Sequence, residues 1–152
     1  MTDMVDERDR SILSELAKDA RQSTSDISRK TGIPRVTVHE RIQRLKEKGV
    51  IKRFTIERDY ALCGRPTTAF VLVGFAPTPG TTTNQRQLAK EIAALDGVHS
   101  VHIIAGEWDI LVKARAESLE KLGGLVIDRL RKLKGVAKTT TMAVLSSVKE
   151  EF

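Results

Sequence analysis

The sequence predicts an α+β protein with a helical N-terminal part and a C-terminal part in which strands and helices alternate. Apolar residues recur at helical spacing up to about residue 49, whereas short apolar runs typical of strands begin near residue 69. Between the two parts, Gly and Pro in the segment 63–66 interrupt both patterns. We therefore expect a helical domain with one following strand over residues 1–60, a linker over 61–66 and a second domain over 67–152.

Composition indicates a soluble, globular and cytoplasmic protein. The 152 residues are 40% hydrophobic and 30% charged, a balance that argues against disorder. No apolar run reaches the roughly 18 residues of a membrane span. The N-terminus MTDMVDERDR is acidic and lacks the pattern of a secretory signal. The single cysteine, Cys63, excludes an internal disulfide and a cysteine-based zinc cluster, and we expect it to be a small packing residue.

Three helices are expected in the first domain. The first spans Asp6 to Ala20, with an apolar stripe that includes Ile12 and Leu16. The second begins in the cluster Ser23-Thr24-Ser25-Asp26, whose side chains cap helices, and Gly32 closes it. A short turn then leads into the third.

The third helix lies within the stretch Gly32 to Gly49, GIPRVTVHERIQRLKEKG. Pro34 suits its first helical position, and Gly49 supplies the left-handed residue that ends it. Val38, Ile42 and Leu45 fall on one face. The opposite face or its borders carry six further residues: Val36, Thr37, His39, Glu40, Gln43 and Arg44. Two helices joined by a short turn with Gly form a helix-turn-helix pattern, winged-helix-like in outline.

Positive charge is concentrated on this third helix. Residues 29–53 carry nine Lys or Arg and two Asp or Glu, which gives this segment a net charge of +7. The net charge of the whole chain is +6. Residues 1–28 carry −3 and residues 54–152 carry +2. A patch of this kind is the electrostatic footprint of a nucleic-acid binder, although many solvated helices are also rich in Lys and Arg.

A strand is expected over Val50 to Ile56, where apolar and polar residues alternate. The second domain then follows the order βαββαβ of a ferredoxin-like fold, in which the first and third strands are central. Its expected elements are strands over 69–76, 98–105, 108–114 and 136–145 and helices over 84–95 and 118–133.

The first strand of this domain, AFVLVGFA, is apolar at successive positions, so both of its faces need cover. Two helices cover only one face of such a sheet. We expect the second face to pack on a second copy of the chain in a two-fold dimer.

No pattern points to catalysis or to a bound metal or cofactor. His99 and His102 lie three apart on an expected strand, so they point to opposite faces and cannot readily share a metal. No catalytic triad spacing, phosphate-binding loop or dinucleotide fingerprint is present. The chain is therefore not expected to be an enzyme.

The turn Ala105-Gly106-Glu107-Trp108-Asp109 is a candidate ligand site. Gly106 allows close approach to backbone amides, and Glu107 and Asp109 supply carboxylates for an amine. An ordinary hairpin in which Asp109 bonds the local backbone explains the same residues equally well. The hydroxyls of Thr139, Thr140 and Thr141 also suit a ligand, but β-branched strand residues are the simpler interpretation.

The sequence resembles the Lrp/AsnC (feast/famine) transcriptional regulators over nearly its whole length. The resemblance rests on VDERDRSILSELAKDAR, DISRKTGI and VHERIQRLKEKGVIK in the first domain, and on GEWD and GVAKTTT in the second. It implies a helix-turn-helix joined to a ferredoxin-like effector domain, dimers that commonly assemble into octamers, and an amino acid bound between C-terminal domains. Gly106 and Asp109 match the family's effector turn, and Thr139 to Thr141 match a strand near that pocket. Where many relatives carry Ser at the start of the recognition helix, this chain has Pro34, so the usual hydroxyl cap is absent.

The preferred interpretation is a regulator that binds double-stranded DNA and reads its major groove. Base-edge or nearby contacts are expected from six residues: Arg35, Val36, Thr37, His39, Glu40 and Arg44. Phosphate contacts are expected from Arg29, Lys46, Lys52 and Arg53. One rival is an amino-acid sensor that acts through a protein partner, against which the basic patch argues. The other is an enzyme built on the ferredoxin-like domain, against which the missing catalytic residues argue.

Overall fold

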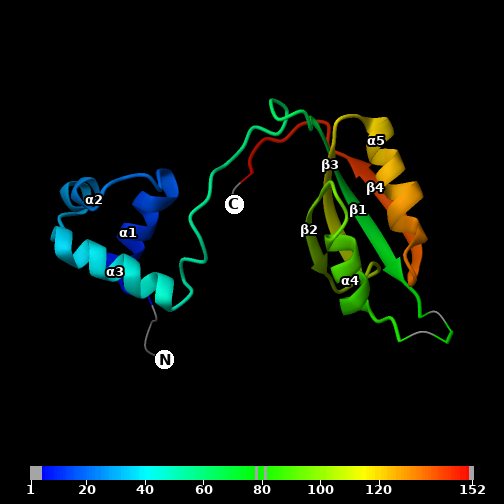
Figure 1. Cartoon of the computed structure of the whole chain (residues 1–152), viewed down its shortest axis with the longest axis horizontal. Coiled ribbons are helices and arrows are strands. Elements are labelled where there is room, and N and C mark those ends of the chain that lie inside the picture. Colours follow the sequence, from blue (N-terminus) through cyan, green and yellow to red (C-terminus); the bar gives the residue numbers. More distant parts are fainter. Residues whose placement is uncertain (1–4, 78, 81, 151–152) are drawn as a thin grey trace. The chain divides into compact units, whose positions relative to one another are not determined.

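The computed structural model describes residues 5–77, 79–80 and 82–150. The chain divides into two compact units, residues 1–57 and 58–152 (Figure 1). Within the described ranges no helix is both long and apolar enough to cross a membrane.

The first unit contains three helices, as the periodicity predicts: α1 (Glu7–Lys18), α2 (Thr24–Thr31) and α3 (Arg35–Glu47). Asp6 and Ser23 cap α1 and α2 through capping boxes, in which each side chain accepts from the third helical amide and the third residue's carboxylate accepts in return. Gly32 ends α2 with a φ of 71°. The predicted inward face of α3 is confirmed, because Val38 packs with Ile12, Ile27 and Ile33 and Ile42 lies against them.

Two details of α3 and its flanks differ from expectation. Pro34 is the residue before the helix, with ψ of 138°, and not the first helical residue. No side chain caps this end, as the missing hydroxyl implies. The strand expected over 50–56 is not formed, because no described segment of the chain runs beside it to complete a hydrogen-bonded ladder. Alternating polarity alone does not make a strand without a neighbour.

The second unit contains a four-stranded antiparallel sheet with the order β2-β3-β1-β4. The elements along the chain are β1 (Thr67–Phe75), α4 (Gln85–Ala93), β2 (Val98–Ile103), β3 (Ile110–Ala116), α5 (Leu119–Gly124) and β4 (Val136–Ala143). The predicted βαββαβ order and the central position of the first and third strands are therefore confirmed. The expected helix 118–133 is not uniform: α5 passes into a wider π-helical turn at Leu125–Arg129 and a tighter turn at Leu130–Lys132.

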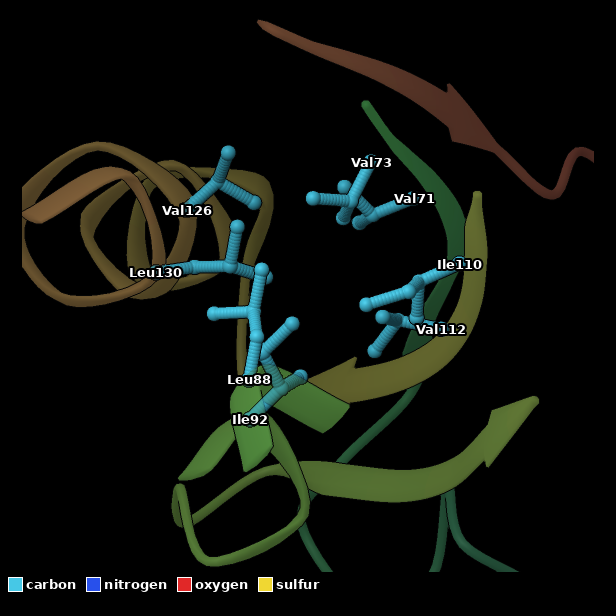
Figure 2. Packing of buried hydrophobic residues seen from close by; sticks show 8 residues of the cluster. All are labelled: Val71, Val73, Leu88, Ile92, Ile110, Val112, Val126 and Leu130. Carbon is cyan, nitrogen blue, oxygen red and sulfur yellow. The ribbon is translucent and has the colours of Figure 1, made fainter. Parts of the chain in front are cut away.

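One face of this sheet carries the core. Val71 and Val73 of β1 and Ile110 and Val112 of β3 point toward residues from the two helical segments (Figure 2). The helical partners are Leu88, Ile92, Val126 and Leu130, all essentially buried. Each Å² of apolar surface that is removed from water contributes about 25 cal/mol to the free energy of folding. This buried layer is therefore the main source of stability for the unit.

The other face of the sheet, called here the open face, carries the intervening residues. Phe70 and Leu72 of β1 lie beside Lys113 and Leu111 of β3, and Met142 of β4 lies beside Phe70. None of these five side chains belongs to the buried core, and Met142 is 44% exposed. No described helix contributes to the cover of this face.

Residues 59–65 form a hydrogen-bonded turn that groups with the second unit. The amide of Arg65 donates to the Tyr60 carbonyl at 2.7 Å, and the amide of Cys63 donates to the Asp59 carbonyl at 3.0 Å. Cys63 is exposed in this turn, so the expectation that it packs in a core is wrong. A turn at the surface tolerates a small side chain without burying it.

Candidate functional site

A buried carboxylate fixes the third helix against the first. Asp9 of α1 is only 1% exposed, and its two oxygens accept from Arg41 Nη1 at 2.8 Å and from Arg44 Nη2 at 3.0 and 2.7 Å. Asp6 extends the network, because its carboxylate accepts from Arg41 Nη1 at 2.8 and 2.6 Å. These contacts tie the C-terminal half of α3 to the start of α1. No sequence pattern pointed to these contacts, because Asp9 and Arg44 lie 35 residues apart.

The network gives Arg44, which was expected to contact bases, a partner on α1. Its Nη2 is held by Asp9, and its Nε is buried without an acceptor in the described part of the chain. The guanidinium is thus directed toward α1. Gln43, the residue before Arg44, is exposed.

The N-terminal half of α3 carries a group of exposed side chains. Val36 is 69% exposed, so its apolar side chain is open to a partner at the surface. Arg35, His39 and Glu40 are also exposed, and Thr37 is half-buried. Arg35 Nε lies 3.4 Å from the hydroxyl of Thr24 at the start of α2, which brings the two helix N-termini together.

The expected phosphate-contacting residues lie at the surface of the same unit. Arg29 is exposed and pairs with Asp26 at 2.7 Å on its own helix. Lys46 is exposed on α3, with a long contact of 3.5 Å from its Nζ to the Gln43 side chain. Lys52 and Arg53 are exposed beyond the end of α3. These four basic side chains therefore lie at the surface of the first unit.

The candidate ligand turn lies at one end of the sheet in the second unit. Asp109 is engaged structurally: one oxygen accepts from the Phe75 amide at 2.8 Å and the other from Gln85 Nε2 at 2.5 Å. The carboxylate thus joins the hairpin to the end of β1 and to the first turn of α4. The local-hairpin interpretation therefore needs a correction, because these partners are 34 and 24 residues away in sequence.

Glu107 remains available at this turn. It is exposed and lies 3.8 Å from Lys138 Nζ of β4, whose ammonium also sits 4.3 Å from the centre of the Trp108 ring. Gly106 has a φ of 137° that favours glycine. A carboxylate and an ammonium side by side complement the two charges of an amino acid. Sequence reasoning missed Lys138, since it is 31 residues from Glu107 along the chain.

The three threonines follow Lys138 along β4. The hydroxyl of Thr139 accepts from Arg131 Nε at 2.8 Å, so Thr139 helps to hold the preceding turn. Thr140 and Thr141 are exposed and pair in register with Leu72 and Val71 of β1. Thr139 is therefore the threonine next to the hairpin, and the other two lead away from it along the strand.

His99 and His102 do not come together with other ligand types. A register shift between Val98 and Ser100 leaves His99 outside the ladder, and its ring contacts Tyr60. His102 is exposed on the open face, in register with Leu111. The residues that the structure describes contain no cluster of three His, Cys, Asp or Glu arranged to hold a metal ion.

A helix-turn-helix unit joined to a ferredoxin-like sheet defines a class of two-domain transcriptional regulators. Residues 5–52 match the family model described as winged helix-turn-helix DNA-binding, and residues 68–152 match that of the Lrp/AsnC ligand binding domain. The chain belongs to the Lrp/AsnC family of transcriptional regulators.

Relatives of similar length support this placement. An uncharacterized HTH-type transcriptional regulator of Pyrococcus abyssi is 50% identical over all 152 residues of both chains. The HTH-type transcriptional regulator FL11 of Pyrococcus horikoshii is 34% identical over 96% of this chain and 93% of its own.

Solved structures show the same fold at lower identity. Escherichia coli AsnC superposes with a TM-score of 0.85 at 21% identity, covering 97% of each chain. A transcriptional regulator from Neisseria meningitidis, solved as a complex with L-Met, superposes with a TM-score of 0.88 at 20% identity, covering 97% of this chain and 94% of its own.

The Asp6 contacts predict an acid-sensitive first unit. Hydrogen bonds from Arg41 and from the Asp9 amide lower the pKa of Asp6 from 3.8 to about 2. A depressed carboxylate pKa adds stability that is complete above the unfolded-state value and disappears as the pH falls through the native value. In Asp6→Asn, which keeps a good helix cap, unfolding free energy should fall less steeply than in the wild type between about pH 4 and pH 2. Urea unfolding followed through the NMR signals of α1 to α3 measures this.

Glu47→Gln is the matched control for that change, because Glu47 is exposed at the end of α3. Its unfolding free energy should fall between about pH 4 and pH 2 as that of the wild type does. An equally steep fall for wild type and Asp6→Asn would show that the Arg41 contact does not persist in solution.

Proposed function

We propose that this chain binds specific double-stranded DNA sequences through the exposed N-terminal half of α3 and that an amino acid modulates this binding. The observation that carries the proposal is the 69% exposure of Val36 between the exposed side chains of Arg35 and His39. A helix that presents an apolar side chain among donors and acceptors suits the major groove, where a thymine methyl adjoins hydrogen-bonding base edges.

The roles within α3 follow from exposure and contacts. We assign base reading to Arg35, Val36, Thr37, His39 and Glu40, with Glu40 suited to accept from cytosine and Arg35 to donate to guanine. Arg44 positions the helix through Asp9 and does not read bases. Arg29, Lys46, Lys52 and Arg53 provide contacts to phosphates, which set affinity and register but carry no sequence information.

Variants of Arg35 and Lys52 separate the two kinds of contact. Arg35→Gln should weaken binding to the chain's own upstream region by about 10-fold or more and leave binding to random DNA nearly unchanged, because one base contact is lost. Lys52→Gln should weaken binding to both and lower the log–log salt slope by about 1. Fluorescence anisotropy over a range of salt concentrations measures both effects.

Arg86→Gln serves as the charge control, since Arg86 is exposed on α4 in the second unit. It should bind as the wild type does. Equal losses on specific and random DNA for Arg35→Gln would remove Arg35 from base reading.

The open face supports a homodimer, from which larger assemblies such as an octamer can be built. Phe70, Leu72, Leu111 and Met142 place apolar side chains on a face that no described helix covers. A second copy that presents the same face would bury them in an isologous interface. Such a dimer supplies two copies of α3 for two half-sites of a partly palindromic DNA.

Leu72→Glu tests this interface. The wild type should have the mass of a dimer or a multiple of it in light scattering at micromolar concentration, and Leu72→Glu should fall to the monomer mass because two buried charges would face each other. Ile127→Glu, at a residue that is 58% exposed on the π-helical turn, should keep the wild-type mass. A monomeric wild type would refute the interface.

The hairpin end of the sheet supports an amino-acid site. Glu107 and Lys138 offer complementary charges 3.8 Å apart, and the hydroxyl of Thr139 lies next to Lys138 in the chain. Asp109 acts by fixing the hairpin whose Gly106 and Glu107 would face the ligand. The regulator from Neisseria meningitidis with L-Met shows that a protein of this fold binds an amino acid. An effector can shift the equilibrium between two states of assembly, or between states of high and low DNA affinity. The size of the shift is limited by the difference in the effector's own affinity for the two states.

Thermal-shift screening of the twenty amino acids tests the site. At least one should raise the unfolding temperature, and Glu107→Gln and Lys138→Gln should each lose that shift while keeping the unfolding temperature without ligand. Glu117→Gln, an exposed carboxylate on the same unit, should retain the shift. No stabilisation and no change in oligomer with any amino acid would mean that the chain acts without such an effector.

A further inference from the structure

A buried arginine lies on the open face, at the end of the sheet away from the hairpin. Arg115 of β3 is only 4% exposed, although it does not point into the helix-covered core. Its Nη2 lies 3.1 and 3.0 Å from the two oxygens of Glu150, and its Nε donates to the Thr68 hydroxyl at 3.4 Å. Lys113, two residues earlier on the same face, also forms an ion pair with Glu150. Two cations thus converge on one carboxylate.

An aromatic ring fixes the arginine in this position. The guanidinium carbon of Arg115 lies 3.7 Å from the centre of the Tyr60 ring, and Arg58 lies 5.0 Å from the same centre. The His99 ring meets Tyr60 edge-on, with ring centres 4.8 Å apart. A planar guanidinium that is stacked on an aromatic ring loses little further freedom when its donors bind a carboxylate. The geometry is therefore that of a preformed carboxylate receptor.

The electrostatic field at this end favours an anion. Burial, followed by the positive charges of Arg115, Arg65, Arg58 and Lys113, lowers the pKa of His99 and so disfavours a further positive charge there. Asp96 pairs with Arg65 at 3.0 Å and leaves Glu150 as the carboxylate that faces Arg115 and Lys113. A nearly fully buried guanidinium requires a counter-anion, because an uncompensated buried charge is strongly destabilising.

Glu150 belongs to the tail that follows β4, and apolar packing does little to hold that tail. Leu145 and Val148 are each 99% exposed. The Glu150 carboxylate, in contrast, reaches the buried Arg115. A carboxylate that is tethered to its site by the chain can be displaced by a free group of the same chemistry, at concentrations that compete with an effective concentration of order mM.

We propose that Arg115, Lys113 and Tyr60 form a binding site for the carboxylate of a small organic anion, which the tail's Glu150 occupies from within the same chain. Free ligand and tail therefore compete for one site. This site differs from the hairpin site, because Arg115 contacts Thr68 at the start of β1 whereas Asp109 contacts Phe75 at its end. It requires neither DNA binding nor the amino-acid effector.

Tyr60 is the single tyrosine of the chain, so protein labelled with 3-fluorotyrosine gives one ¹⁹F resonance that reports on the site. Glutarate, whose end resembles a glutamate side chain, is the probe. In Glu150→Gln, glutarate should shift this resonance in a saturable manner, with a dissociation constant at least 10-fold lower than in the full-length wild type, because the competing carboxylate is gone. Chloride at equal ionic strength should not reproduce the shift.

Glu120→Gln, at an exposed residue in the first turn of α5, should respond to glutarate as the wild type does. Lys113→Gln combined with Glu150→Gln should weaken glutarate again, and Arg115→Gln combined with Glu150→Gln should abolish the response. Equal affinity in the wild type and Glu150→Gln, or no saturable shift in Glu150→Gln with the ¹H spectrum still folded, would overturn the proposal. Retained DNA binding in either case would leave the proposed function standing.

Discussion

The ion-paired carboxylate of Asp9 is the constraint on which the first unit depends. A carboxylate that is 1% exposed is tolerated only when its oxygens are fully paired, and Arg41 and Arg44 both supply donors from α3. The pairing fixes the C-terminal half of α3 against α1, while Val38 and Leu45 fix its inner face by burial. The N-terminal half, with Arg35, Val36 and His39, remains displayed, and Gln43 and Lys46 are exposed further along the helix. The surface proposed to read DNA is therefore a consequence of how the helix is held.

The sequence predicts what depends on local periodicity. The inward face of α3 follows from the spacing of Val38, Ile42 and Leu45, and the central position of β1 follows from its unbroken apolar run. Contacts between distant residues escape such reasoning: the Asp9–Arg44 pair spans 35 residues and the Asp109–Phe75 bond spans 34. The missing strand over 50–56 has the same cause. A strand needs a neighbouring segment to which it is hydrogen-bonded, and alternating polarity within 50–56 says nothing about such a neighbour.

The sheet of the second unit carries different chemistry at its two ends. At the hairpin end, both carboxylate oxygens of Asp109 accept hydrogen bonds within the unit, whereas Glu107 and Lys138 lie at the surface. At the other end, Arg115 is buried on the open face and takes its counter-charge from the tail. The apolar residues between these ends, Leu72 and Leu111 among them, supply the face proposed to pair with a second copy. Assembly and two kinds of ligand recognition would thus share one sheet, with Lys113 of the carboxylate site beside Phe70 on the open face.

The central claim is that the exposed half of α3 reads a DNA sequence. Competition gel shifts of the full chain on its own upstream region, against random DNA of equal length at physiological salt, test it most directly, since such regulators commonly control their own promoters. The account predicts that the upstream fragment binds about 10³-fold or more tightly than random DNA, the range of specific readers. Equal affinity for the two fragments would contradict it and would leave α3 as a basic surface without sequence discrimination.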